Sequence, residues 1–276
     1  MKPRTPQQVR ILAIAFAVLV LLTTLLMWQG VRHGDAVRVG IPKSYTAAGA
    51  APLLQTSAAQ YVCTLGSTTA VLQKALLAGD LDAALIPYDM AVSCEGCEIR
   101  AILGYEQLLL LGRRDAVHVQ DLDNSTLVLP QKLQNSALAK MLEALLRKED
   151  TFCTILYSDD FSEAEWIACS LDDAAAILKA QPGIRICFSI TRSARHALDT
   201  APYGLCLTVR KDYLQQAGTD YDAFERRLQD AVHYADEKRK KTVAMMASSG
   251  IAADEAEANL LYPYCSFRYM DPTTLE

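Results

Sequence analysis

Residues 61–87 read YVCTLGSTTAVLQKALLAGDLDAALIP, and this stretch indicates the fold class. Tyr61–Leu65 has the length and apolar character of a strand, and the small polar turn Gly66-Ser67-Thr68-Thr69 follows it. Apolar residues then recur at helical spacing up to Gly79, namely Val71, Leu72, Ala75, Leu76 and Leu77. Leu81–Ile86 reads as another strand, which ends at Pro87. The order strand, helix, strand predicts a parallel β-α-β unit.

The same order of elements occurs on both sides of this stretch. Val37–Ile41 precedes it and predicts a first strand that ends at Pro42. A second series starts near Asp121. Its predicted elements are a strand at Thr126–Leu129, a helix from the caps Asn135-Ser136 to Arg147, a strand at Thr154–Tyr157, a helix over Glu163–Ala180 with a break near Ser170 as an option, and a strand at Ile184–Ile190. The C-terminal part is predicted to be mostly helical, most clearly at Tyr221–His233 and Asp254–Leu261.

Two long apolar extended runs, Ile102–Leu111 and Tyr203–Val209, lie between the two series. They predict an α/β fold of two doubly wound lobes joined by two crossing strands, as in a hinged clamshell. The expected parts are an N-terminal segment at 1–35, a first lobe at 36–103 plus 206–276, a second lobe at 112–200, and hinge crossings at 104–111 and 201–205.

The N-terminus indicates the compartment. No charged residue occurs between Ile11 and Gly30, and Lys2, Arg4 and Arg10 precede this apolar run. A span of about 20 apolar residues after basic ones is typical of a transmembrane or signal helix. No small-x-small cleavage site follows, so an uncleaved anchor is favoured over a cleaved signal. We therefore expect the chain on the extracytoplasmic face of the bacterial cell membrane, tethered by residues 11–30, or secreted if the segment is cleaved.

Composition excludes several classes of protein. The 276 residues are 51% hydrophobic and 21% charged, which excludes disorder as the main state. The net charge of −5 argues against a nucleic-acid binder, because phosphate binding needs clustered Lys and Arg. No repeat of solenoid or propeller length recurs.

Candidate ligand-binding residues follow from the expected topology. In open parallel sheets, ligands bind beyond the carboxyl ends of the strands, where helix N-termini present free N–H groups. For single residues such as Ser67, Ser136 and Asp89, a simple N-cap role is an equal alternative. The residues at these ends are Lys43, Ser44, Tyr45, Gly66, Ser67, Thr68, Tyr88 and Asp89 in the first series, and Gln131, Asn135, Ser136, Ser158, Asp159 and Thr191 in the second.

The charge of the ligand stays open at this level. Helix N-termini favour an anion, and Lys43 is the one cation among the first-lobe candidates. Asp89, Asp159 and Asp160 would instead favour an amine or a neutral heterocycle.

Catalytic and metal motifs are missing from the sequence. It contains no G-x-S-x-G elbow, Walker A loop or G-x-G-x-x-G, and its four histidines are scattered. We therefore expect no catalytic residues, no metal site and no cofactor. Among the eight cysteines, Cys94-Glu95-Gly96-Cys97 forms a CxxC in a turn-like stretch. A local disulfide or plain thiols are favoured there over a redox pair or half of a metal site, because no second CxxC or HxxxH completes a zinc site.

The order of these motifs resembles the type II solute-binding proteins of ABC importers, in the nitrate, sulfonate, taurine and thiamine-precursor group. The similar segments are Gly40-Ile41-Pro42 with Ala51-Pro52-Leu53, Gly66-Ser67-Thr68 with Leu76 to Pro87, Asp121-Leu122 before Thr126-Leu127-Val128, and Pro202-Tyr203-Gly204 into Leu207 to Arg210. Two features depart from that family: only about a dozen residues, near 47–59, separate the first two strands, and Asp123-Asn124-Ser125 lacks the usual Lys.

This resemblance implies a monomeric component of an ABC importer that captures a small organic or oxyanionic solute between two lobes and delivers it to permease subunits in the membrane. It implies no nucleic-acid partner. Two alternatives remain: an enzyme on the same fold, similar to chorismate dehydratases or thiamine-pyrimidine synthases, or a tethered solute sensor. The enzymes of this fold are cytoplasmic, so the apolar N-terminal segment counts against them.

Overall fold

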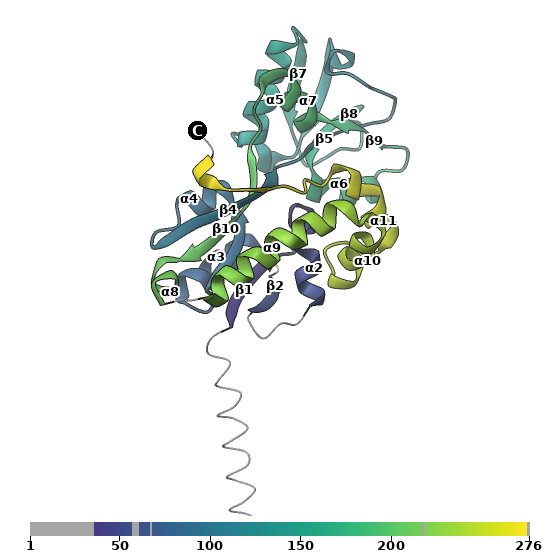
Figure 1. Ribbon diagram of the computed structural model, residues 1–276. Helices are drawn as coiled ribbons and strands as arrows, with labels where there is room; N and C mark the ends of the chain where they lie inside the picture. The colour runs from purple at the N-terminus through teal and green to yellow at the C-terminus, as the bar shows by residue number, and fades with distance from the viewer. Residues whose placement is uncertain (1–35, 57–60, 67, 217–218, 275–276) are drawn as a thin grey trace, which may run out of the picture. The chain divides into compact units, whose positions relative to one another are not determined.

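The computed structural model describes residues 36–56, 61–66, 68–216 and 219–274 (Figure 1). The chain from Val37 onward forms one compact unit. The anchor predicted at residues 11–30 lies outside the described residues. Within the described ranges, no helix has the length and apolar character needed to span a membrane.

One sheet has six strands in the order β11-β4-β10-β3-β1-β2. β1 pairs in parallel with β2 and β3, whereas β10 runs antiparallel to β3 and β4, and β11 runs antiparallel to β4. The sheet is therefore mixed rather than wholly parallel. Its strands are β1 (Val37–Pro42), β2 (Tyr61–Gly66), β3 (Ala83–Pro87), β4 (Cys97–Tyr105), β10 (Tyr203–Arg210) and β11 (Tyr269–Met270).

Helices cover both faces of this six-stranded sheet. On one face, Phe224 and Leu228 of the long helix α9 (Thr219–Glu237) share a core with Val39 of β1. On the other face, Leu72 and Leu76 of α3 (Thr69–Ala78) share a core with strands β3 and β4. The other short helices near this sheet are η1 (Tyr45–Ala50), α2 (Ala51–Gln55), α4 (Tyr88–Val92), α8 (Lys211–Gln216) and η5 (Pro272–Thr274).

Local sequence explains the limits of α3. The side chain of Thr68 accepts a hydrogen bond from the Val71 N–H at 3.3 Å and caps the first turn. Gly79 ends the helix at φ +81°, a left-handed conformation that glycine adopts without steric cost. The next strand begins four residues later at Ala83.

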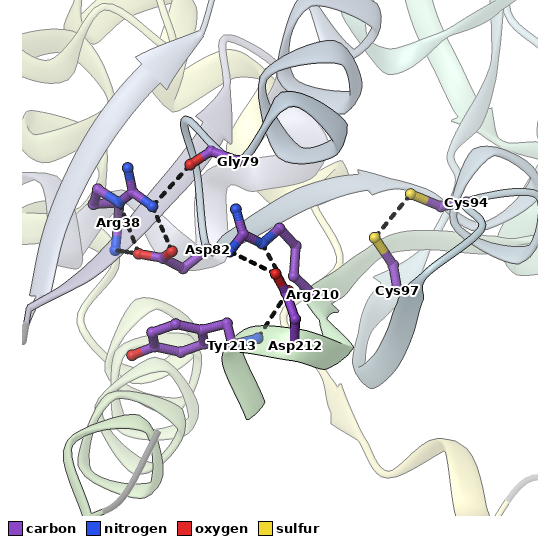
Figure 2. A network of polar contacts seen from close by, with 8 residues as sticks. All are labelled: Arg38, Gly79, Asp82, Cys94, Cys97, Arg210, Asp212 and Tyr213. Carbon is purple, nitrogen blue, oxygen red and sulfur yellow. Dashed lines mark hydrogen bonds and ion pairs between the residues drawn. The ribbon is translucent and has the colours of Figure 1, made fainter. Parts of the chain in front are cut away.

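Figure 2 shows how the start of β1 is tied to the loop between α3 and β3. The Arg38 backbone N and Nε donate to Asp82 Oδ2 at 3.0 and 2.9 Å, and Arg38 Nη2 donates to Asp82 Oδ1 at 2.6 Å. The same Nη2 donates to the Gly79 carbonyl at 2.9 Å. Because Asp82 is only 4% exposed, this guanidinium gives a buried carboxylate the charge partner that it needs.

The other sheet has five strands in the order β7-β6-β8-β5-β9. β6 runs parallel to β7 and β8, and β5 runs antiparallel to β8 and β9, so this sheet is mixed as well. The strands are β5 (Leu108–Gly112), β6 (Ser125–Leu129), β7 (Cys153–Tyr157), β8 (Trp166–Ser170) and β9 (Arg185–Ser189), and the associated helices are η2 (Val119–Leu122), η3 (Gln131–Leu133), α5 (Ala137–Lys148), α6 (Leu171–Ala180) and α7 (Ile190–Leu198).

The C-terminal helices join the core of the five-stranded sheet. α10 (Arg239–Ser249), α11 (Glu255–Leu261) and η4 (Tyr262–Tyr264) follow α9 in the chain. Met246 and Leu261 belong to the same hydrophobic core as Leu109 of β5 and Ile167 of β8, and Ala51 of α2 also joins this core. α10 packs against α11, α2 and α9, and α11 contacts α6, so this core links helices that are associated with the two different sheets.

One predicted element is wrong in its first part. The helix expected over Glu163–Ala180 is a strand, β8, up to Ser170, where a break was predicted as an option, and the helix α6 from Leu171 onward. Trp166–Cys169 is a fully buried run between β6 and β5, and a short buried run cannot be assigned to helix or strand by periodicity alone. Ser170 then caps α6 by accepting from the Asp173 N–H at 3.3 Å.

The two apolar runs that were expected to cross between lobes differ from that expectation in detail. Ile102–Leu111 is divided between β4 in one sheet and β5 in the other, with Glu106 and Gln107 between them. Tyr203–Val209 lies entirely in β10 of the six-stranded sheet. The chain thus passes between the sheets at residues 106–107 and 199–202, and the Glu106 N–H donates to the Pro202 carbonyl at 2.9 Å.

Candidate functional site

A cavity of about 820 Å³ lies where three helices begin and where the chain passes between the two sheets. Its walls come from the starts of α4, α5 and α6, from the passage at 106–107 and from the return passage at 198–203. The lining residues are Thr46, Tyr88, Asp89, Glu106, Gln107, Lys132, Leu133, Asn135, Ser136, Ala137, Leu138, Met141, Ala144, Ser170, Leu171, Asp172, Leu198, Thr200, Ala201, Pro202 and Tyr203.

The first turns of the three helices present polar groups to this cavity. Asp89 Oδ1 accepts a hydrogen bond from the Met90 N–H at 2.9 Å in α4. The Ser136 hydroxyl caps α5 by accepting from the Ala139 N–H at 3.1 Å. The Ser170 hydroxyl caps α6 by accepting from the Asp173 N–H, whereas α4 has no side-chain cap. Since four N–H groups at a helix start lack partners within the helix, a single cap leaves further donors there.

Four of the residues predicted from the sequence line the cavity: Tyr88, Asp89, Asn135 and Ser136. They come from different sheets, Tyr88 and Asp89 after β3, and Asn135 and Ser136 after β6. Asn135 has a φ of +66°, and this left-handed turn precedes α5. The rule that ligands bind beyond strand ends therefore brings these four residues to one cavity.

A second group of predicted residues, Lys43, Ser44 and Tyr45, lines a smaller cavity of about 280 Å³. Asp172 lines both this cavity and the large one. The Ser44 hydroxyl donates to Asp172 Oδ2 and the Tyr45 N–H donates to Asp172 Oδ1, both at 2.7 Å. These bonds join the segment after β1 to the start of α6, that is, elements associated with different sheets.

The electrostatics of this contact follow from burial. Burial raises the pKa of the Asp172 carboxyl, although the bonds from Ser44 and Tyr45 counteract the rise. The Tyr45 hydroxyl hydrogen-bonds the Glu257 carboxylate of α11. Burial and this bond raise the pKa of Tyr45, so its phenol stays protonated at neutral pH.

The other predicted residues are not among those that line the large cavity. Thr68 caps α3, Gly66 packs against Leu72, and Ser67 lies outside the described residues. The Gln131 N–H donates to Asp159 Oδ1 at 3.0 Å, a bond that joins the segments after β6 and β7. The Ser158 hydroxyl accepts from the Asp160 N–H at 3.0 Å in a local turn.

Thr191 supports the passage between the sheets. It is 1% exposed, its hydroxyl accepts from the Leu108 N–H at 2.8 Å, and the same hydroxyl donates to the Glu106 carbonyl at 3.0 Å. Its hydroxyl thereby fixes the backbone on which the Glu106 side chain stands.

Sequence reasoning missed several lining residues, above all Glu106, Gln107, Lys132, Asp172 and Tyr203. A signal for the first two was present, because Glu106-Gln107 is the polar interruption of the otherwise apolar run Ile102–Leu111. Asp172 was missed because the strand that ends just before it was predicted as helix.

The Glu106 carboxyl is the most perturbed acid of the cavity. Burial, followed by the negative charges of Asp89 and Asp172, raises its pKa to about 7. Lys132 contributes a positive charge, but its Nζ forms an ion pair with Asp173 Oδ1 at 2.6 Å. The cavity is therefore acidic, with a carboxyl that titrates near neutrality.

Two of the sequence predictions concern metal ligands and cysteines. Within the described ranges, no group of three or more His, Cys, Asp or Glu side chains is placed to hold a metal ion. All eight cysteines are free thiols, and Cys94 and Cys97 lie with their Sγ atoms 3.1 Å apart at the start of β4 (Figure 2). Neither of the two lines the cavity.

Comparisons with known proteins identify the fold. No protein-family model matches the chain, and no curated protein matches it. Among solved structures, an ABC transporter protein from Parabacteroides distasonis is similar with a TM-score of 0.67 at 13% identity, over 87% of each chain. The ligand-binding component of an ABC-type import system from Staphylococcus aureus, with zinc bound, has a TM-score of 0.61 at 14% identity, again over 87% of each chain.

A third similar structure is the periplasmic aliphatic sulphonate-binding protein SsuA from Escherichia coli. Its TM-score is 0.53 at 16% identity, over 85% of this chain and 79% of that one. At such identities the likeness concerns the fold and does not extend to the ligand. The chain therefore has a mixed α/β fold like that of these solute-binding proteins, which confirms the α/β class predicted from the sequence.

Proposed function

We propose that this chain is an extracytoplasmic solute-binding protein of an ABC importer, and that it captures a small solute in the 820 Å³ cavity. The observation that supports this proposal most is the position of the cavity. It lies at the starts of α4, α5 and α6 and beside both passages between the sheets, which is where a two-lobed α/β protein binds ligands.

The proposal includes closure of two lobes around the solute. The lobes would be 36–103 plus 206–276, and 112–200, with hinges within 104–111 and 201–205. Gly104, at φ +69°, stands one residue before the end of β4, and a glycine has the backbone freedom that a hinge uses. The bonds from Ser44 and Tyr45 to Asp172 would form on closure, because they join elements of different lobes.

Location and partners are part of the same proposal. The apolar segment 11–30 would tether the protein to the extracytoplasmic face of the membrane, or direct its secretion if cleaved. A monomer would then deliver its solute to permease subunits. Protease treatment of intact cells or spheroplasts tests the location: protection of residues 36–276 from cleavage would contradict it.

Solute capture is tested by native mass spectrometry and thermal unfolding of the protein with a small-molecule cell extract and with pure compounds. A solute at 100 times its Kd adds about 2.7 kcal/mol to the free energy of unfolding. For a chain of this size, that raises Tm by about 5–10 °C.

A matched pair of variants locates the binding. Ala137 is exposed and lines the cavity at the first residue of α5, so Ala137→Trp should fill the cavity and abolish the shift. Ala180 is exposed at the end of α6 and does not line it, so Ala180→Trp should leave the shift unchanged. Failure of every extract fraction to bind, or equal binding by both variants, would contradict the proposal.

A further inference from the structure

The Glu106 carboxylate lacks a partner inside the protein. The backbone of this residue is fixed on both sides, since its N–H donates to Pro202 O at 2.9 Å and its carbonyl accepts from Thr191 Oγ1 at 3.0 Å. The side chain is mostly buried and lines the cavity, yet no hydrogen bond or ion pair reaches its carboxylate from the part of the chain that the structure describes. Its oxygens are open to the cavity, so the donor that they need comes from water or from a ligand that replaces the water.

The charges around Glu106 are mainly negative. Asp89 at the start of α4 and Asp172 at the start of α6 line the same cavity and act on Glu106 electrostatically. Lys132 is the one cation among the lining residues, and Asp173 already pairs with it at 2.6 Å. An anion entering the cavity would therefore meet three carboxyl groups and a lysine that is already paired.

Helix N-termini do not reverse this balance. Asp89 stands in the first turn of α4, and Asp172 and Asp173 stand in the first turn of α6, so these helix starts face acidic side chains of their own. Of the three helices that begin at the cavity, α5 is the one without an acidic residue in its first turn. One free helix start, equivalent to about half a positive charge, cannot offset three carboxylates.

Aromatic rings stand beside these acids. The rings of Tyr88 and Tyr203 both line the cavity, with centroids 5.2 Å apart and planes at 58°. Tyr203 in turn stacks on Tyr105 at 6.0 Å. Tyrosine faces attract cationic groups, and the combination of rings and carboxylates is the chemistry that recognises organic cations.

We propose that the solute carries a positively charged nitrogen group, such as an ammonium, amidinium or guanidinium, which Glu106 and Asp89 hold against Tyr88 and Tyr203. This inference rests on the proposed function, because it assigns the class of solute to the same cavity. The nitrogen would supply the donor that Glu106 lacks, and its charge would compensate the acidic lining.

Matched probes of opposite charge test this inference. Isothermal titration of the full chain at pH 8 compares benzamidine with benzoate, and 1,4-diaminobutane with succinate. We expect the two cations to bind and the two anions not to bind. Glu106→Gln keeps the shape of the side chain and removes its charge, so it should weaken binding of the cations by more than tenfold.

The control is Glu163→Gln, which removes an equal charge from an exposed residue that does not line the cavity, and it should change affinity by less than twofold. Preference for benzoate or succinate, or equal affinity of Glu106→Gln and wild type, overturns the inference. Binding of none of the four probes counts against it as well. The solute recovered from cell extract then separates the two proposals: a solute without a cationic nitrogen overturns this inference alone, and no recovered solute contradicts the proposed function too.

Discussion

Glu106→Gln should make the ligand-free protein more stable at alkaline pH. The folded protein raises the pKa of this carboxyl from its usual 4.5 to about 7, mainly by burial and then through Asp89 and Asp172. Between these two pH values the folded state binds a proton that the unfolded state has lost. Stability is therefore lost as pH rises from 4.5 to 7, and above 7 the full cost of the buried charge remains.

The size of the effect follows from the same pKa values. A rise from 4.5 to about 7 corresponds to about 3 kcal/mol of unfolding free energy above pH 7. The glutamine amide keeps a polar group in the cavity, so about 2–3 kcal/mol should be recovered. For a chain of this size, that raises Tm by about 4–12 °C at pH 8.5, and the gain should vanish near pH 4.

Urea unfolding of wild type and variant at pH 4, 7 and 8.5 measures this difference directly. Glu163→Gln removes an exposed charge and should show no such pH dependence. The charged groups that line the cavity with Glu106 are Asp89 on α4, Asp172 on α6 and Lys132 on η3. The reasoning is refuted if Glu106→Gln destabilises the protein at pH 8.5, or if its effect is the same at all three pH values.

Three further changes test other parts of the structure. Asp82→Asn weakens the three hydrogen bonds from Arg38. Because the Arg38 side chain is 46% exposed, water can solvate its guanidinium in the variant, and the unfolding free energy should fall by about 2 kcal/mol. The measurement is a lower Tm with unchanged solute affinity. Thr68→Ala removes the cap of α3 and should cost about 1 kcal/mol in a urea titration, whereas a tenfold loss of affinity would show that Thr68 binds the solute. Burial raises the pKa of the Cys97 thiol to about 12, so iodoacetamide at pH 8 should label it slowly, and rapid labelling of the reduced protein would contradict the buried thiol. Mild oxidation should form the Cys94–Cys97 disulfide, which mass spectrometry measures as the loss of two hydrogen atoms.

The order of most strands and helices along the chain, and their caps, were accessible from the sequence because they depend on local residue types. The run Val37–Pro42 alternates little and ends in proline, and it forms β1. Ser136 and Gly79 have the residue types of an N-cap and a C-terminal glycine, and they perform those roles. Trp166–Ser170 is a strand because it pairs with β6 and β5 in the sheet. The local sequence pattern does not show these pairings, so this segment was predicted as helix.

The candidate site was accessible only in part, for a related reason. Asp89 and Ser136 follow strands whose ends could be located, and the topology rule then brings them to one cavity. Whether a residue after a strand faces the cavity or turns into a local bond depends on tertiary contacts. Thr191 is an example, because its hydroxyl is hydrogen-bonded to the backbone of Glu106 and Leu108, which are far away in sequence.

The cavity also shows why fold and ligand have to be argued separately. Helix starts around a cleft favour anions in general, and one structure with this fold is that of a sulphonate-binding protein. In this chain, Asp89 and Asp172 occupy the first turns of two of the three helices, so the side chains oppose the backbone dipoles there. Glu106 adds a carboxyl between the sheets, at the one place where both passages of the chain meet. Because these charges come from side chains and not from the backbone, the same architecture can favour a ligand of the opposite charge. Glu106→Gln removes a side-chain charge and leaves the backbone dipoles in place, so it separates the contribution of the side chains from that of the helix starts.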